Sequence, residues 1–303
     1  MKTPVSRRWI EEILRRSLPG YALSSFDLLE GGKTNRNYLL RFANCDDAMV
    51  LRVYARGRES CEKELALWRL TREVVPVPDF VAADVQGLEQ ASPYAIYRFA
   101  EGVTFQEIKK TGNSADMAGA AFAIGAALAR VHGIDSSRTT VASRRGLEES
   151  FELSLASPIL EQRIGRTERL HDLLSRWRPR LRGLDASRTL VHGDFNNRNT
   201  IVRQVGDAWV VAAILDWELA FTGTPWWDAA RFVCYEHADR PCREPFFSNG
   251  YRENGGKLPE DWPRTARVIN AVSAVRSLAD AGTPDEFVED LRELVEQIVT
   301  SGV

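Results

Sequence analysis

The chain has 303 residues, of which 44% are hydrophobic and 27% charged, and its formal net charge is −2. This composition is typical of a globular protein and excludes a disordered chain, and the small net charge provides no overall field that would attract nucleic acid. The four cysteines, Cys45, Cys61, Cys234 and Cys242, have neither CxxC spacing nor the density of a disulfide framework. We therefore expect reduced thiols in a cytoplasmic protein.

The N-terminal third predicts a small sheet with two helices. Residues 1–20 carry charges within an apolar stripe and end at Pro19-Gly20, which indicates an amphipathic helix and not the uninterrupted apolar core of a signal peptide. Residues 21–99 then alternate apolar and polar side chains in short runs such as RNYLLRF and AMVLRVY, a pattern typical of strands joined by hairpins. The segment RESCEKELALWRLTRE, residues 58–73, interrupts the strands with the period of a helix.

Beyond residue 100 the apolar residues recur mostly with a helical period. The predicted helices cover residues 114–132, 146–156, 159–182, 226–238, 263–280 and 285–300. The longest apolar run, Met117–Ala129, is too short to cross a bilayer, so we expect a buried helix whose small side chains allow close packing, and no membrane contact. The fold class predicted is α+β, with a small antiparallel-sheet lobe at residues 1–98 and a larger, mainly helical lobe at residues 99–303.

The stretch LVHGDFNNRNTIV, residues 190–202, places several polar side chains between two apolar flanks. His192, Asp194 and Asn199 follow the pattern H-x-D-x-x-x-x-N, which is the spacing of the catalytic loop in phosphoryl-transfer enzymes of the kinase type. In that chemistry an Asp orients the acceptor hydroxyl and takes its proton, and an Asn supplies a neutral oxygen to Mg²⁺. We expect His192 to support the loop and not to act as the base.

A hairpin follows directly, because two strand-like runs flank the turn Gly206-Asp207 in IVRQVGDAWVVAAILDWELAF. The second run ends at Asp216, and such a hairpin would return the chain so that Asp216 lies next to Asn199. In a kinase an Asp at this place is the main Mg²⁺ ligand. The order and spacing of Asp194, Asn199 and Asp216 thus predict a magnesium-dependent phosphoryl transfer.

The chain resembles the aminoglycoside phosphotransferase family and its choline-kinase-like relatives, which are small-molecule kinases with a protein-kinase-like fold. The resemblance rests on HGDFNNRN and ILDWELAFTGTPWWDAARF, where Asp-Trp-Glu stands in place of Asp-Phe-Gly. It extends upstream through MVLRVY, EKELALW, IYRFAEG and ALARVHGID, so that it covers roughly residues 28–235. It implies a bilobal enzyme with a nucleotide-binding lobe at residues 1–98 and a catalytic and acceptor-binding lobe at residues 99–303.

The resemblance also implies a role for particular residues. Asp194 would be the catalytic base, and Asn199 with Asp216 would hold Mg²⁺ while ATP or GTP serves as co-substrate. Arg52 takes the place of the lysine that contacts the nucleotide phosphates, which a guanidinium fork can also bind, and Glu64 would be its ion-pair partner. A surface ion pair without a catalytic role is the alternative for these two. Asp228 resembles a later aspartate of the family with a structural task.

Two further segments of the first lobe would bind the nucleotide. IYRFAEG, residues 96–102, would be the hinge that binds the base through backbone groups, with Tyr97, Arg98 and Phe99 at its centre. EGGKTNRNY, residues 30–38, would cover the phosphates through backbone N–H groups, with Gly32, Lys33 and Asn35 as contacts. It lacks the G-x-G-x-x-G pattern, so an ordinary hairpin turn is the alternative.

The acceptor is expected to be a small molecule with a hydroxyl group, because the twelve positions from Asp216 to Asp228 leave no long segment on which a peptide would lie. The resemblance favours an aminoglycoside-type antibiotic, hence antibiotic resistance, bound by carboxylates and aromatic side chains of the second lobe. The candidates are Glu218, Glu236, Asp239, Glu244, Glu260, Asp261, Tyr235 and Trp262. A metabolite kinase acting on choline, homoserine, a ketosamine or a sugar is the alternative, followed by a catalytically silent nucleotide-binding module.

Overall fold

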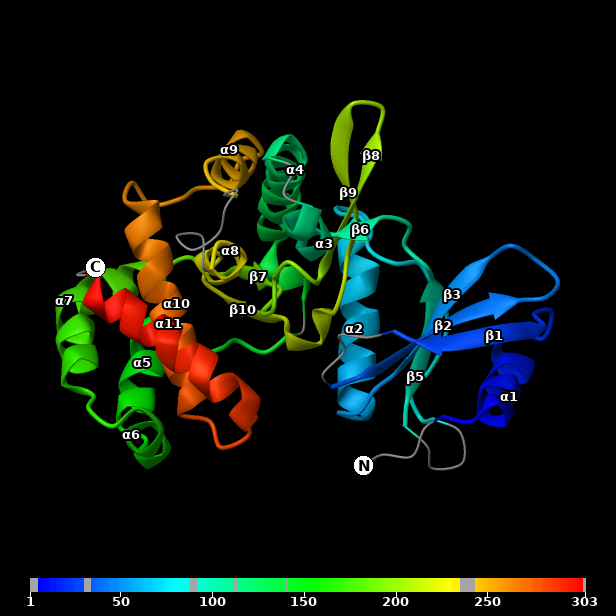
Figure 1. The fold of residues 1–303 in the computed structure, drawn as a ribbon, viewed down its shortest axis with the longest axis horizontal. Coiled ribbons are helices and arrows are strands. Elements are labelled where there is room, and N and C mark those ends of the chain that lie inside the picture. The colour runs from blue at the N-terminus through cyan, green and yellow to red at the C-terminus, as the bar shows by residue number, and fades with distance from the viewer. Residues whose placement is uncertain are drawn as a thin grey trace. The chain divides into compact units, whose positions relative to one another are not determined.

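The structure is a computed structural model that describes residues 5–29, 34–87, 92–111, 114–139, 141–234 and 243–301. The chain divides into two compact units. Residues 1–102 and 212–218 form unit 1, and residues 103–211 and 219–303 form unit 2. The segment 212–218, which ends two residues after Asp216, is thus separated in sequence from the rest of unit 1, and each unit is described below by itself (Figure 1).

In the described part of unit 1, five strands form an antiparallel sheet in the order β1-β2-β3-β5-β4. They are β1 (Leu23–Leu28), β2 (Arg36–Phe42), β3 (Ala48–Val53), β4 (Phe80–Asp84) and β5 (Tyr94–Arg98). Three of them coincide with the alternating segments of the sequence, because strand side chains point to opposite faces in turn. The predicted small antiparallel sheet is confirmed.

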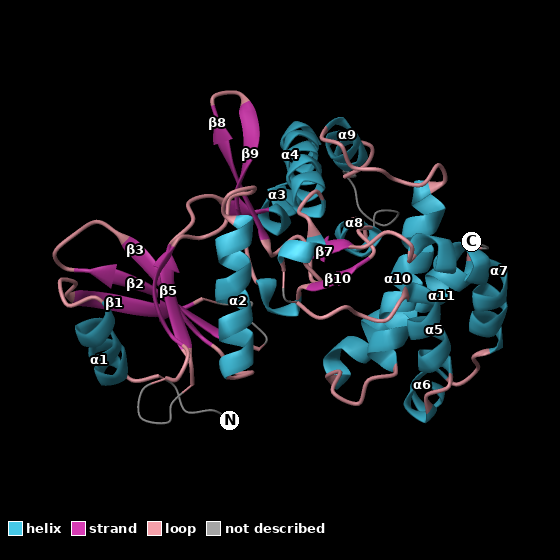
Figure 2. Cartoon of the chain, turned by 180° about the vertical axis from the view of Figure 1, so that it is seen from behind, coloured by secondary structure: helices cyan, strands magenta, loops and turns pink. Residues whose placement is uncertain are grey.

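Two helices cover opposite faces of this sheet (Figure 2). Helix α1 (Arg7–Ser17) packs Ile10, Ile13 and Leu14 on one face, and Ser6 caps its N-terminus by accepting the N–H of Trp9. Helix α2 (Arg58–Thr71) packs Cys61 on the other face, against Tyr54 and Ala95. Both helices were predicted from their periodicity, and both are confirmed.

Unit 2 is mainly helical (Figure 1). Its helices in the described residues are α3 (Phe105–Thr111), α4 (Ser114–His132), α5 (Leu147–Leu155), α6 (Pro158–Ile164), α7 (Glu168–Leu184), α8 (Trp226–Phe232), α9 (Phe246–Glu253), α10 (Trp262–Leu278) and α11 (Val288–Thr300). Its strands are β6 (Val103–Thr104), β7 (Thr189–Val191), β8 (Thr200–Val205), β9 (Ala208–Ile214) and β10 (Phe221–Gly223), and β9 runs from unit 2 into the segment 212–218 of unit 1. The predicted α+β class, with a small antiparallel sheet and a larger, mainly helical part, is therefore confirmed.

Helix α4 is the apolar helix of the sequence, and it packs side by side with α9 (Figure 2). The small side chains are required there: a Cβ on Gly125 would lie 2.1 Å from the Phe247 carbonyl oxygen, and one on Gly250 would lie 2.0 Å from that of Phe122. By length and composition alone α4 would be able to cross a bilayer, since it extends beyond the apolar run on which the sequence prediction rested. More than half of its most apolar stretch is buried within the chain, as in the core helix of a globular unit.

Two helix predictions differ from the structure, and two observed helices were not predicted. The helix predicted at residues 159–182 is two helices, α6 and α7, because Gly165 adopts a positive φ of 72° that ends α6. The helix predicted at residues 226–238 ends at Phe232, and residues 235–242 lie outside the described part. Helices α3 and α9 were not predicted, because seven or eight residues give too few periods to stand out.

Candidate functional site

The loop between β7 and β8 contains the residues of the H-x-D-x-x-x-x-N pattern, all within unit 2. The amide nitrogen of Asn199 donates to the backbone oxygen of Asp194 at 2.9 Å and to its carboxylate Oδ2 at 3.1 Å. The nitrogen is thus engaged, and Oδ1 of Asn199 has no partner within the described residues. The Asp194 side chain is about one-third exposed (32%), with Oδ1 lying 3.8 Å from Nη2 of Arg231. The predicted pair of Asp194 and Asn199 is therefore brought together by the loop itself.

Asp228, from α8, holds this loop in place. Its carboxylate is fully buried and accepts the N–H of His192 at 2.6 Å and the N–H of Gly193 at 2.9 Å, one on each oxygen. Nε2 of His132 lies 3.3 Å from the same carboxylate, and Nδ1 of His132 contacts the hydroxyl of Tyr251 at 2.8 Å. Asp228 therefore has the structural task that its position indicated, while the link to His132 and Tyr251 had no signal in the sequence.

The side chains of His192 and Phe195 anchor the loop to the interior of unit 2. Nδ1 of the fully buried His192 accepts the N–H of Asp194 at 3.3 Å, so His192 supports the loop as expected. The ring of Phe195 packs against His192 and against Phe232, which in turn contacts Phe247 on α9. The loop is thus packed against a cluster of aromatic side chains, and this packing fixes the position of Asp194.

Gly193 is required at its position. Its φ is 85°, and a Cβ would lie 2.3 Å from the carbonyl oxygen of Leu219. Gly193→Ala is expected to lower the free energy of unfolding by about 1–2 kcal/mol from backbone strain alone, with a further loss from the clash, and to reduce activity by displacing Asp194. Urea denaturation of both proteins measures this loss.

The control for this prediction is Gly165→Ala. Gly165 has a similar φ of 72°, but nothing lies within 4 Å of a Cβ placed there. Gly165→Ala therefore introduces backbone strain without a steric clash. An equal loss of stability in the two variants would contradict the role given to the contact with Leu219.

In unit 1 three carboxylates lie within 4 Å of one buried arginine. Arg52 on β3 is 5% exposed, and its Nε lies 3.2 Å from Oε2 of Glu64 on α2. Its Nη2 donates to Oδ1 of Asp216 at 2.6 Å and lies 3.8 Å from Oε2 of Glu218. The predicted pair of Arg52 and Glu64 is formed, and its burial differs from the exposed ion pair that was the alternative.

Burial and charge act against each other in this cluster. Burial opposes the charge of Arg52, but Glu64 and Asp216 outweigh it, so the pKa of Arg52 lies well above its ordinary value. Burial raises the pKa of Glu64 although Arg52 acts in the opposite direction, and burial raises the pKa of Tyr97 to about 12. The guanidinium of Arg52 is thus a permanent charge that holds Asp216 in place.

Asp216 has the one positive φ, 67°, that the described residues show outside glycine. Aspartate tolerates this region better than most residues, and such a backbone is often found at functional sites. The segment is held by the backbone N–H of Trp217, which donates to Glu64 at 3.3 Å, and by Arg52. Oδ2 of Asp216 has no partner within the described part of the chain, and the side chain is 33% exposed. Asp216 and Asn199 belong to different units, so their proximity stays a prediction.

Asn35 and Glu218 belong to the same cluster. The Asn35 amide donates to Oε2 of Glu218 at 2.8 Å and accepts the N–H of Ala55 at 3.0 Å, and both side chains are buried. The carboxylate of Glu218 is therefore occupied within unit 1, which disfavours the acceptor-binding role predicted for it. The signal that sequence analysis did not use was the place of Glu218 two residues after Asp216.

The predicted hinge lies at the end of β5. The N–H of Arg98 donates to the Asp79 carbonyl at 2.9 Å and the N–H of Phe99 donates to the Ala48 carbonyl at 3.0 Å, so both amides are occupied. Both side chains are exposed, whereas the ring of Tyr97 packs against Phe80. Within the described residues the N–H groups of Ala100, Glu101 and Gly102 have no partner, so Ala100 is the first donor after β5 that this segment leaves available.

Apart from Glu260, which is exposed, the remaining predicted residues divide into two groups. Gly32, Lys33, Tyr235, Glu236 and Asp239 lie outside the described residues. Trp262 is 2% exposed and donates to Glu244 at 3.1 Å, and Asp261 contacts Arg180, so these three already have partners within unit 2. A buried Trp262 is not a wall of an open site, because the tertiary packing of α10 covers it.

No set of three or more His, Cys, Asp or Glu side chains within the described ranges would form a metal cage by itself. Kinases hold Mg²⁺ with one or two carboxylates and the nucleotide phosphates, so such a cage is not required. Next to Asp216 in unit 1 there is a cavity of about 20 Å³, lined by Trp68, Phe80 and Tyr97. It has room for about one water molecule and not for a nucleotide base.

Comparison with known proteins places the chain in a family. The model of the phosphotransferase enzyme family matches residues 25–267. A curated relative, "Acyl-CoA dehydrogenase family member 10" of Mus musculus, is 25% identical over 232 residues. These residues are 73% of this chain but 21% of the relative, so the chain spans about a fifth of that protein.

Solved structures share the fold over almost the whole chain. A GDP complex of a mutant aminoglycoside 2'-phosphotransferase-IIIa is 15% identical, with a TM-score of 0.78 and coverage of 98% of both chains. A thermostable aminoglycoside phosphotransferase APH(4)-Ia, in a ternary complex with AMP-PNP and hygromycin B, has 17% identity, a TM-score of 0.69 and coverage of 97% and 98%. The choline kinase LicA of Streptococcus pneumoniae is 16% identical, with a TM-score of 0.68 and coverage of 97% and 98%.

The family match and the fold agree with the catalytic loop and with the buried Arg52 cluster. The chain therefore belongs to the phosphotransferase enzyme family, and it has the fold of aminoglycoside phosphotransferases and of a choline kinase.

Proposed function

We propose that the protein transfers the γ-phosphoryl group of ATP or GTP to a hydroxyl group of a small molecule, with Asp194 as the catalytic base. The observation that carries this proposal is the geometry of Asp194 and Asn199. The Asn199 amide nitrogen holds the Asp194 carboxylate at 3.1 Å, and the amide oxygen stays free. A partly exposed carboxylate fixed in this way is suited to orient a hydroxyl group.

In this reaction Asp194 accepts the hydroxyl proton while the acceptor oxygen forms a bond to the γ-phosphorus. The bond between the γ-phosphorus and the bridging oxygen breaks, and the nucleoside diphosphate leaves. Two side chains hold Asp194: its backbone N–H donates to Nδ1 of His192, and the amide of Asn199 donates to its carboxylate. Its rigid placement supplies the orientation on which a loose transition state depends.

The residues fit a magnesium nucleotide. Asn199 Oδ1 offers a neutral oxygen and Asp216 Oδ2 offers a charged one, and these are the ligand types that Mg²⁺ prefers. When bound, Mg²⁺ neutralises charge on the phosphate oxygens. We infer that Arg52 adds a fixed positive charge for the phosphates while it positions Asp216, and that the N–H of Ala100 donates to the base.

Two proposals about the biological role follow the resemblance. The free thiols of Cys45, Cys61 and Cys234 and the need for a nucleoside triphosphate favour a cytoplasmic enzyme.

Two classes of acceptor are proposed. The first is an antibiotic of the aminoglycoside type, whose phosphorylation would confer resistance, and the second is a metabolite. Of the predicted acceptor carboxylates that the structure describes, Glu218 and Glu244 are occupied by other side chains, so these two give no support to a polycationic acceptor.

The test is the release of ADP or GDP over a panel of acceptors. The panel contains aminoglycosides, macrolides, choline, homoserine, sugars and hydroxycarboxylates, each with ATP and with GTP, and Asp194→Asn is the blank. Release that depends on an acceptor and disappears in the blank would establish the proposed reaction. Equal release by the two proteins would contradict it.

A further inference from the structure

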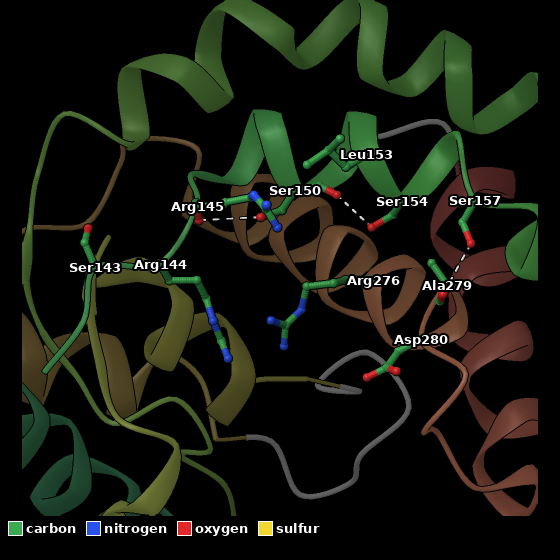
Figure 3. Close-up of a pocket in the computed structure, with 10 residues that line it drawn as sticks. All are labelled: Ser143, Arg144, Arg145, Ser150, Leu153, Ser154, Ser157, Arg276, Ala279 and Asp280. Atoms are coloured by element: carbon green, nitrogen blue, oxygen red, sulfur yellow. Dashed lines mark hydrogen bonds between the residues drawn. The ribbon is translucent and has the colours of Figure 1, made fainter. Parts of the chain in front are cut away.

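Unit 2 contains a groove of about 720 Å³ that none of the predicted site residues lines. One wall consists of residues 143–145 and helix α5, and the other consists of the end of α10 with Ala279 and Asp280 (Figure 3). The side chains of Arg144 and Arg276 point into the space between the two walls (Figure 3). A groove of this size accommodates a small organic molecule.

The two arginines have no polar partner. Within the described residues neither guanidinium forms a hydrogen bond or an ion pair, and Nη1 of Arg144 and Nε of Arg276 are buried. Aromatic faces support them: Arg144 lies 4.2 Å from the ring centre of Phe221, and Arg276 lies 5.1 Å from that of Trp227. Arg144 also lies 5.6 Å from the ring of Trp227, so both guanidinium groups stack on the same side chain.

Burial of the two guanidinium charges of Arg144 and Arg276 close to one another costs free energy. Burial and, to a smaller extent, the charge of Arg276 lower the pKa of Arg144 to about 10, while the charge of Asp228 acts in the opposite direction. Burial also lowers the pKa of Arg276, although Asp280 opposes this effect. Both groups are still charged at neutral pH, and each buried charge without a partner costs free energy. An anion between them would supply the missing partner.

The other polar groups on the walls are already engaged. One oxygen of Asp280 accepts the N–H of Gly282 at 2.9 Å, and the charge of this carboxylate acts on Arg276 from the rim of the groove. The hydroxyl groups of Ser154 and Ser157 donate to backbone oxygens, and the exposed Arg145 pairs with Glu149. The guanidinium groups of Arg144 and Arg276 are therefore the strong donors that the groove offers, and guanidinium groups bind carboxylate and phosphate oxygens well.

The elements that position the two arginines also hold the catalytic loop. Phe221 pairs with Val191, the residue before His192, in the ladder of β10 and β7. Trp227 precedes Asp228, whose carboxylate holds the loop and whose charge also acts on Arg144. The groove and Asp194 thus belong to one packed part of unit 2.

We propose that Arg144 and Arg276 bind the oxyanion of a small molecule, a carboxylate or phosphoryl group, and that the acceptors of the enzyme carry such a group beside the hydroxyl that is phosphorylated. This inference rests on the proposed function for its second half, whereas the anion site stands without it. A polycationic acceptor such as an aminoglycoside would be repelled by the two guanidinium groups. The groove therefore favours the metabolite kinase over the antibiotic kinase.

The anion site is tested first by binding alone. Glycerol 3-phosphate and a series of hydroxycarboxylates of two to six carbons are titrated into the full chain by calorimetry, beside their neutral counterparts, glycerol and the hydroxyamides. We expect at least one anionic probe to bind, and Arg144→Gln and Arg276→Gln each to weaken its binding by about ten-fold or more. Whether phosphate or carboxylate probes bind more tightly identifies the type of oxyanion.

The matched control is Arg145→Gln. Arg145 stands on the rim of the same groove and loses the same charge, but its side chain is 67% exposed and paired with Glu149. Binding close to that of the unchanged protein is expected for this variant. An equal loss in all three variants would show a general effect of charge, and binding of no anionic probe, or unchanged binding in the two buried variants, would overturn the anion site.

Activity separates the second half of the inference from the proposed function. With an anionic acceptor, Arg144→Gln and Arg276→Gln should raise the KM for the acceptor by about ten-fold or more and leave the KM for the nucleotide unchanged. Preferred turnover of neutral or cationic acceptors, unaffected by the two variants, would refute an anionic acceptor. Anion binding without any phosphoryl transfer would instead retain the anion site and contradict the proposed function.

Discussion

Asp194→Asn is expected to reduce the turnover of the best acceptor by about 10²–10⁴-fold, because the asparagine amide cannot take the hydroxyl proton. Binding of the nucleotide should change little, since Asp194 is assigned to the acceptor and not to the phosphates. The variant should also fold normally, because its amide oxygen can still accept the Asn199 hydrogen bond that holds the carboxylate at 3.1 Å. Steady-state release of ADP and calorimetric titration of the nucleotide measure the two effects separately.

The informative comparison is Asp228→Asn. The Asp228 carboxylate accepts one backbone N–H on each oxygen, from His192 and from Gly193, and an amide would present N–H groups to one of these donors. A stability loss of about 1.5–3 kcal/mol is therefore expected, accompanied by a loss of activity. Asp194→Asn should lose activity with an unchanged melting temperature. If Asp194→Asn retained turnover, the assignment of the base would be wrong.

Arg52→Met is expected to lower the free energy of unfolding by about 3–5 kcal/mol, because it leaves the buried carboxylate of Glu64 without its cation and leaves Glu218 with Arg56, at 3.9 Å. Arg52 is 5% exposed and lies within 4 Å of both. Such a loss is a large part of the stability of an ordinary domain, so urea denaturation should show it clearly. Arg52→Lys keeps the charge and should lose less, and the double variant Arg52→Met with Glu64→Leu should recover part of the loss.

The same variant makes stability depend on pH in a defined direction. Burial already raises the pKa of Glu64, and removal of Arg52 would raise it further above its value in the unfolded chain, where it is about 4.3. A group with a raised pKa in the folded state stabilises fully below its unfolded pKa, and this stability is lost as the pH rises through the folded pKa. The deficit of Arg52→Met should therefore shrink as the pH falls from about 8 to about 5. A deficit that does not depend on pH would exclude Glu64 as its cause.

The catalytic loop could be predicted almost completely from the sequence. The spacing of Asp194 and Asn199 within one loop is short, so a local turn brings them together without help from distant elements. The anchoring by Asp228, in contrast, joins residues 35 and 36 positions apart, and its link to His132 spans 96 positions. Contacts at such distances leave no periodic signal in a sequence.

The helices, too, were predicted where a long local pattern exists and missed where it does not. The pattern of residues 114–132 predicted α4 with its correct bounds, because nineteen residues contain five turns of a buried stripe. The close approach of Gly125 to α9 explains why that stripe is made of small residues. The break at Gly165 was not predicted, since an isolated glycine in a helical pattern is usually tolerated.

The sequence by itself determined the fold class, the geometry of the loop with Asp194 and Asn199 and the likeness to the phosphotransferase family, since these depend on local periodicity and short spacing. Only the tertiary structure decided which charges are compensated. It buries Glu218 beside Arg52 and Asn35, and it leaves Arg144 and Arg276 on opposite walls of a groove without an ion pair among the described residues. The two arginines are 132 positions apart in the sequence, where Arg144 stands among arginines and glutamates and Arg276 in a mainly apolar stretch. Burial and the direction of a side chain determine whether a charge is available to a ligand, and both arise from packing between distant segments.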